Sequence, residues 1–129
     1  VLSNGALIAK KQDGKQAVWH WKISKPHATY LISFVGGEYS ALKDGVWEGI
    51  EVTNWAPKGV EPWVDNAFGG THRIVEFFSG LVGVKYPWEK YAQSAVPEFM
   101  FGGMENVSCT TNTITATFPK EVNPLQSAT

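Results

Sequence analysis

The sequence contains one cysteine, Cys109, among 129 residues. A single thiol excludes an internal disulfide framework and any zinc site built from several thiolates. The chain also lacks an apolar run near the ~20 residues that a helix needs to cross a bilayer, and it has no signal-peptide pattern. We therefore expect no transmembrane segment in this chain, and its cellular compartment stays open.

An excess of one charge is also missing, because 11 basic and 12 acidic residues give a formal net charge of −1. These charges are scattered along the chain, so no basic patch indicates a nucleic-acid partner. The length is sufficient for one domain with a real core. We predict a single compact unit over residues 1–129, without internal repeats.

Most of the chain carries β patterns. Residues 7–11 and 16–23 flank Asp13-Gly14, a pair that favours the tight turn of a hairpin. Residues 29–42 are rich in β-branched and aromatic side chains, and the two glycines inside this run indicate a bulge or bend. Further extended segments are predicted, in chain order, at 49–55, at 85–101 with breaks at Pro87 and Pro97, and at 106–118.

The apolar period changes after a turn-rich connector between Pro57 and Pro62. Asp65 or Thr71 is the predicted N-cap of a helix, and Gly83 its end. Gly69-Gly70 argue against an uninterrupted helix, so its start stays open. The side chains expected on its apolar face are Val64, Phe68, Ile74, Val75, Phe78 and Leu81.

These patterns predict an α+β fold that is mostly β, with an antiparallel or mixed sheet, a hairpin and one main helix. The run FGGMENVS at residues 101–108 is the strongest sign of chemistry. Its adjacent glycines allow another chain to approach the backbone closely, and Glu105 places a carboxylate beside that bare stretch. We interpret this combination as a grip for the end of a peptide.

The stretch KYPWEKYAQ at residues 85–93, followed by VPEFMFGGMENVSCTT, resembles zinc aminopeptidases of the gluzincin type, the family of membrane alanyl aminopeptidase and leukotriene hydrolase. Their exopeptidase signature, G-x-M-E-N, is matched by residues 102–106. The resemblance implies that residues 1–28, approximately, end an N-terminal β-domain. Residues 29–129, approximately, would then begin a thermolysin-like catalytic domain.

The resemblance also implies substrate-binding roles for the motif. Glu105 would bind the free α-ammonium of a peptide, because a carboxylate gains charge-assisted hydrogen bonds that an internal amide cannot supply. Gly102 and Gly103 would pair with the substrate backbone as an added strand. Met104 or Phe101 would border the first side-chain pocket. Asn106 completes the predicted substrate-binding set, and we expect it to orient the loop more than to touch substrate.

The family holds its zinc with H-E-x-x-H and a later glutamate, and this chain contains neither. We therefore expect a fragment of a zinc aminopeptidase in which H-E-x-x-H follows within a few tens of residues. The remaining domains of that parent would be its partners, and the zinc ligands would lie outside this chain. The chain alone is predicted to be inactive, with no catalytic or metal-binding residue of its own.

Other interpretations stay open. A catalytically dead homologue of the family differs only in residues outside this chain. A non-catalytic, β-rich binding module is the alternative from a different class, because the six tryptophans offer flat faces to a sugar or a peptide. A planar, exposed row of tryptophans would favour that module, and burial of most of them would favour the peptidase.

Overall fold

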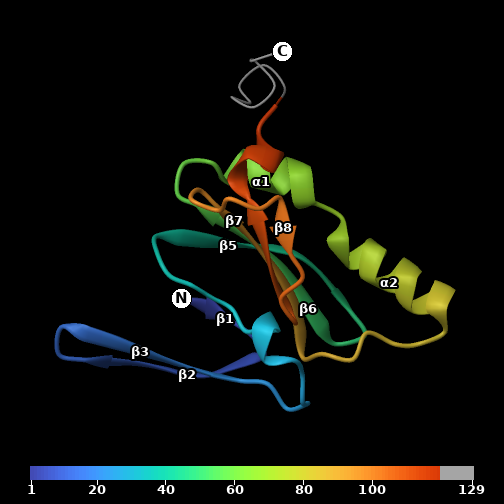
Figure 1. Ribbon diagram of the computed structural model, residues 1–129, viewed down its shortest axis with the longest axis horizontal. Helices are drawn as coiled ribbons and strands as arrows, with labels where there is room; N and C mark the ends of the chain where they lie inside the picture. The colour runs from blue at the N-terminus through green and yellow to red at the C-terminus, as the bar shows by residue number, and fades with distance from the viewer. Residues whose placement is uncertain (120–129) are drawn as a thin grey trace.

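The computed structural model describes residues 1–119, in which a mixed β-sheet is covered by helices and by the N-terminal segment (Figure 1). The predicted α+β, mostly β class is confirmed. In chain order the elements are β1 (Leu2–Ser3), β2 (Ala6–Asp13), β3 (Gln16–Lys22), the 3-10 turn η1 (Thr29–Leu31), β4 (Phe34–Val35), β5 (Tyr39–Trp47), β6 (Ile50–Pro57), α1 (Glu61–Phe68), α2 (Thr71–Val82), β7 (Lys90–Val96), β8 (Gly103–Met104), β9 (Cys109–Thr113) and the 3-10 turn η2 (Ile114–Thr117).

The main sheet of residues 1–119 has the strand order β5-β6-β7-β9-β8. β5 and β6 are antiparallel, whereas β6 pairs in parallel with β7 and β7 pairs in parallel with β9. β8 returns antiparallel to β9 and forms one edge of the sheet. α1 and α2 lie in the crossover between the parallel strands β6 and β7, as such connections require.

The predicted hairpin is formed by β2 and β3, which pair from Ala6 with Lys22 to Asp13 with Gln16. Gly14 lies in its turn at a φ of 57°, a left-handed conformation that glycine adopts without strain. In Figure 1 this hairpin extends away from the main sheet.

Two predicted strands are shorter than expected. The run 29–42 is divided into η1, β4 and β5, because β4 pairs with β1 while β5 joins the main sheet. Gly36-Gly37 lie at this change of sheet, and the chain bends at Gly37, which is one of the two outcomes predicted for this pair. The run 106–118 contains just β9 before it tightens into η2.

The predicted helix is present as α2, preceded by the shorter α1. Gly69-Gly70 separate the two helices, Gly70 at a φ of 87°, and Gly83 ends α2 at a φ of 69°. Asp65 was wrong as an N-cap, since it lies inside α1. Thr71 is the first residue of α2 rather than its cap.

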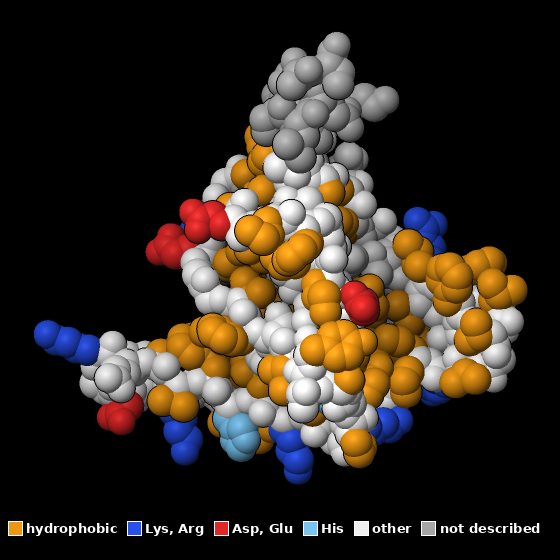
Figure 2. Space-filling view, in the orientation of Figure 1, with side chains coloured by type: hydrophobic (Ala, Val, Ile, Leu, Met, Phe, Trp, Pro, Cys, Tyr) orange, Lys and Arg blue, Asp and Glu red, His pale blue; other side chains and the backbone are white. Residues whose placement is uncertain are grey.

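The apolar face of the helices is only partly buried. Val64 and Val75 are buried, and Phe68 is partly buried against the cluster around Val64. The other predicted side chains, Ile74, Phe78 and Leu81, are exposed within residues 1–119. Figure 2 shows hydrophobic side chains gathered over α2. The exposed large apolar side chains of α2 are Ile74 at 53%, Phe77 at 62%, Phe78 at 54%, Leu81 at 67% and Val82 at 63%. We call these residues the α2 face.

The core consists of clusters on the two faces of the sheet. Ala95 packs with Ala56, Val64 and Ile114 beneath α1. Ala92, which points to the opposite face of β7, packs with Leu2 and Cys109. The second cluster fixes the N-terminal segment on the sheet beside the strands that lead to the motif.

Candidate functional site

The motif lies at an open edge of the main sheet. Gly103 pairs with Asn112 and Met104 with Thr111, so β8 uses one side of its backbone for β9. The N–H of Thr113 extends this ladder to the carbonyl oxygen of Gly102, at 3.1 Å. The other side of β8 has no strand partner in residues 1–119. An extended peptide can pair with such an edge.

Gly102 and Gly103 leave this edge without side chains, and the space beside the two glycines differs. A Cβ added to Gly102 would meet no atom within 4 Å, so space lies open beside it. A Cβ on Gly103 would lie 3.2 Å from Oδ1 of Asn112, which is a tight contact. Glu105 follows directly and is exposed, and its carboxylate makes no hydrogen bond or ion pair to residues 1–119. The edge thus presents backbone groups and a free negative charge.

A cavity of about 350 Å³ adjoins β8 on the Leu2 side of the sheet. Apolar and aromatic side chains dominate its wall, and segment 33–36 crosses over it. The predicted residues Met104 and Asn106 contribute to this wall. Its lining is Ser33, Phe34, Val35, Gly36, Tyr39, Val96, Phe99, Met104, Asn106 and Thr111.

Phe101 is 64% exposed and lies next to Phe99, with 5.8 Å between the ring centroids. It does not line the cavity, whereas Met104 does. Of the two predicted neighbours of the first pocket, Met104 is therefore the one that the structure places at a cavity. Phe101 instead adds exposed apolar surface, together with Met100 at 89% and Phe34 at 79%.

Asn106 is buried at 5% exposure, unlike the other motif residues. Its Nδ2 donates to the carbonyl oxygen of Leu31, at 3.3 Å, and its Oδ1 accepts from Oγ1 of Thr111, at 2.9 Å. These bonds hold the Asn106 side chain within the loop, and its loop-orienting role stays a prediction.

Asn4 is the residue at this site that sequence reasoning missed. Its Nδ2 lies 2.6 Å from the carbonyl oxygen of Val107, directly after the motif. The two residues are 103 positions apart, and an asparagine near the start of the chain carries no motif signal of its own. Only the packing of the N-terminal segment on the sheet reveals the contact.

Residues 1–119 do not hold a candidate metal site. No group of three or more histidine, cysteine, aspartate or glutamate side chains converges among them. His72 pairs instead with Asp44, at 2.9 Å between Nδ1 and Oδ2. Zinc does not fit the residues of this part of the chain.

Cys109 and Lys90 are buried groups with structural surroundings. Burial raises the pKa of the Cys109 thiol to about 11, so the thiol stays protonated and unreactive near neutral pH. Burial lowers the pKa of Lys90 to about 8. Its Nζ lies 4.7 Å from the ring centroid of Trp21 and donates to the carbonyl oxygens of Ser3, at 2.6 Å, and Gly5. Lys90 thereby ties the N-terminal segment to β7.

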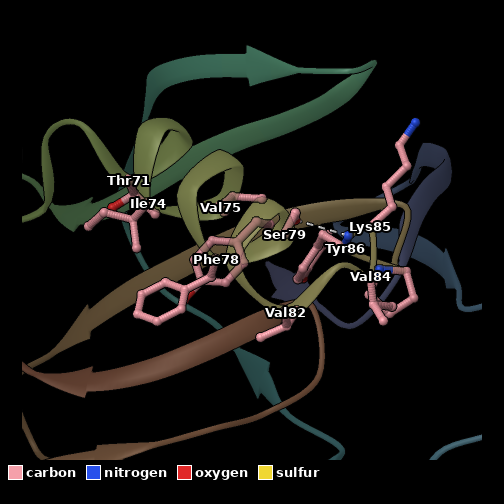
Figure 3. Close-up of a pocket in the computed structure, with 11 residues that line it drawn as sticks. Thr71, Ile74, Val75, Phe78, Ser79, Val82, Val84, Lys85 and Tyr86 are labelled. Atoms are coloured by element: carbon pink, nitrogen blue, oxygen red, sulfur yellow. Dashed lines mark hydrogen bonds between the residues drawn. The ribbon is translucent and has the colours of Figure 1, made fainter.

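An apolar groove of about 470 Å³ runs along α2 (Figure 3). Phe78 and Val82 line it from the helix, and Val84 and Tyr86 line it from the segment that follows. The N–H of Tyr86 donates to Oγ of Ser79, at 3.2 Å, which fixes this segment against α2. Lys85 is the charged residue in its lining, and none of the motif residues 101–106 lines the groove.

The six tryptophans do not share one element, since they lie on β3, β5, β6, α1 and the segment before β7. Trp21 and Trp55 pack against the Leu2 cluster, and Trp63 packs edge-on against Phe118, at 4.9 Å between centroids. Trp63 is the most exposed of the six, at 38%. The six tryptophans are spread over separate elements and five of them are partly buried, so the structure gives neither a single exposed row nor the burial of most of them that would favour the peptidase. Within residues 1–119, no helix has the length and apolar character to span a membrane.

Comparison with known proteins gives the class first: the relatives are aminopeptidases. Endoplasmic reticulum aminopeptidase 1 of Mus musculus is 27% identical over 92 residues, covering 71% of this chain and 10% of the relative. Aminopeptidase M1 of Arabidopsis thaliana is 28% identical over 115 residues, covering 89% of this chain and 13% of the relative. Aminopeptidase N of Acetobacter pasteurianus is 30% identical over 80 residues, covering 61% of this chain and 22% of the relative.

Residues 66–124 match the model of the peptidase family M1 domain. This match and the aminopeptidase relatives confirm the resemblance of the chain to gluzincin-type aminopeptidases. The matched range contains the motif residues 102–106. The chain spans between about a tenth and a quarter of the length of these relatives.

Proposed function

We propose that this chain supplies the substrate grip of a zinc-dependent aminopeptidase that removes residues from the amino end of peptides. One observation carries the proposal: the motif forms an unpaired sheet edge that ends at an exposed carboxylate. The substrate backbone would pair with β8 as an added strand. Its α-ammonium would then bind Glu105, which has no competing cation among residues 1–119.

The cavity beside Met104 is the proposed site for a substrate side chain. Side chains of an added strand alternate between the two faces of the sheet, so one of them would enter a hollow on the Leu2 side. The wall of Phe99, Met104, Val35 and Tyr39 favours an apolar side chain there. Zinc would be held by residues of the parent enzyme outside this chain and would supply the activated water that cleaves the peptide bond.

The test is Glu105→Ala in the full-length protein that contains this chain. If the carboxylate supplies ~2 to 4 kcal/mol of charge-assisted binding, kcat/KM for an aminoacyl amide falls by roughly 30- to 1000-fold. The matched acetyl-aminoacyl amide loses far less, because it has no ammonium to bind. Zinc content is measured in both proteins and is expected to stay the same.

Equal losses of kcat/KM on the two substrates would mean that Glu105 maintains the structure of the site and does not bind the substrate ammonium. Loss of zinc in the variant would likewise contradict the assigned role. A parent protein without aminopeptidase activity would overturn the proposed function as a whole.

A further inference from the structure

The side chain of Asn4 lies between the N-terminal segment and the loop that follows Glu105. Its Nδ2 donates to the carbonyl oxygens of Val107, at 2.6 Å, and Leu31, at 3.1 Å. Its Oδ1 accepts from the N–H of Ser33, at 2.7 Å. Asn4 is 6% exposed, so loss of its side chain would leave these backbone groups without a ready substitute from water.

The backbone around Asn4 is itself fixed. The N–H of Gly5 donates to Oγ of Ser108, at 2.8 Å, and Ser108 has a φ of 60°, which is rare outside glycine. A Cβ on Gly5 would lie 2.1 Å from the carbonyl oxygen of Lys22, so the segment runs directly against β3. The backbone that carries Asn4 is therefore held in place, and the Asn4 side chain extends from it to the loop.

Leu31 joins Asn4 to the motif. Its carbonyl oxygen accepts from both Asn4 and Asn106, the residue after Glu105. Because the Glu105 carboxylate makes no hydrogen bond or ion pair with residues 1–119, its position depends on the backbone at either side. β9 holds that backbone before Glu105, and the Asn4 and Asn106 hydrogen bonds hold it afterwards.

Building on the proposed function, we propose that Asn4 is a positioning residue for Glu105, acting through Val107 and Leu31. It lies in the part of the chain predicted to end the N-terminal β-domain, whereas Glu105 lies in the part predicted to begin the catalytic domain. The N-terminal segment would thus set the distance between the ammonium-binding carboxylate and the scissile bond of the peptide.

The test compares Asn4→Asp with Asn4→Ser in the full-length protein. Aspartate keeps the size of the side chain and the acceptor for Ser33, but it cannot donate to Val107 and Leu31 when ionised. Serine is too short to donate to Val107 and Leu31, and it adds no charge. The control is Asn66→Asp, an exposed asparagine on α1. The readout is the ratio of kcat/KM for an aminoacyl amide to kcat/KM for its acetylated counterpart.

Both Asn4 variants are expected to lower this ratio about tenfold or more, since small displacements of a positioning group have effects of that order. Asn66→Asp is expected to leave it unchanged. The ratio does not depend on the fraction of folded enzyme, because unfolded protein reduces both rates equally. Hydrogen exchange of the backbone amides of residues 105–109 is expected to rise in the Asn4 variants.

An unchanged ratio in the Asn4 variants, with Glu105→Ala lowering it, would overturn the positioning role alone. An unchanged ratio in Glu105→Ala would overturn the proposed function, and the positioning role with it. A ratio that falls equally in Asn66→Asp would also contradict the inference, because the effect would not be specific to the contact with the loop.

Discussion

Asp44 shows how one side chain can anchor a helix from a distant strand. Its carboxylate accepts from the backbone N–H groups of Gly70, at 2.6 Å, and His72, at 2.7 Å. α2 has no acidic residue in its first turn and no side-chain cap of its own, so Asp44 satisfies N–H groups that would otherwise be unpaired. Burial alone would raise the pKa of Asp44, but the hydrogen bonds from His72 and Gly70 hold it below its usual value.

Asp44→Asn is expected to lower the free energy of unfolding by about 1 to 3 kcal/mol, because a buried charged acceptor is replaced by a neutral amide. Urea unfolding at pH 7 measures the change. The matched control is Asp65→Asn, since Asp65 is exposed on α1 and its side chain holds no helix end. A loss of the same size in both variants would contradict the anchoring role.

The same anchor predicts a pH dependence. Because the pKa of Asp44 is lower in the folded protein than in the unfolded chain, its stabilisation is fully present above the ordinary aspartate pKa of ~3.9. It is lost as the pH falls through the folded-state pKa. The difference in the free energy of unfolding between the parent chain and Asp44→Asn should therefore shrink as the pH falls. A difference that stays constant from pH 7 to below the folded-state pKa of Asp44 would contradict this prediction.

At the scale of elements, α2 and β5 approach each other at the place where β5 is irregular. The pairing of β5 with β6 shifts register between Lys43 and Gly45, so Asp44 bulges toward the start of α2. A Cβ on Gly45 would lie 2.6 Å from the His72 ring, which means that glycine permits the contact. The bulge and the glycine together allow Asp44 to reach the helix.

Gly45→Ala is expected to destabilise the chain by about 1 to 3 kcal/mol, because α2 must move away or the His72 ring must turn. Gly36→Ala is the control, since an added Cβ there meets nothing within 4 Å and its backbone is not left-handed. Thermal unfolding of both variants provides the comparison. Indistinguishable midpoints would show that the helix adjusts without cost.

At the scale of the whole molecule, the α2 face is too apolar for a surface that faces only water. Five large apolar side chains of one helix are more than half exposed, and the chain spans a small part of its relatives' length. Such a patch is typical of a surface that other protein covers.

We expect the chain on its own to self-associate through the α2 face as its concentration rises. Phe78→Glu with Leu81→Glu should reduce that association, whereas Glu76→Gln, a polar change on the same helix, should not. Sedimentation velocity over a concentration series measures both effects. A chain that stays monomeric throughout, or that associates equally after both changes, would rule out this face.

The sequence by itself determined the features that depend on neighbouring residues. Asp13-Gly14 indicated the hairpin because a tight turn needs a residue with positive φ, and Gly83 indicated the end of α2 for the same reason. The GGMEN run predicted the family because its residues are contiguous. Its residue types also indicated a bare backbone beside a carboxylate, as β8 and Glu105 present them.

The tertiary structure decided what depends on residues far apart in the chain. Local pattern could not show that β8 forms a sheet edge, since strand order arises from the parallel pairing of β7 with β9. It could not identify Asn4 or Asp44 either, because their partners lie 103 and 26 to 28 positions away. Periodicity predicted an apolar face for the helix, but burial of that face requires a covering surface. Residues 1–119 supply one for Val75 and not for Phe78.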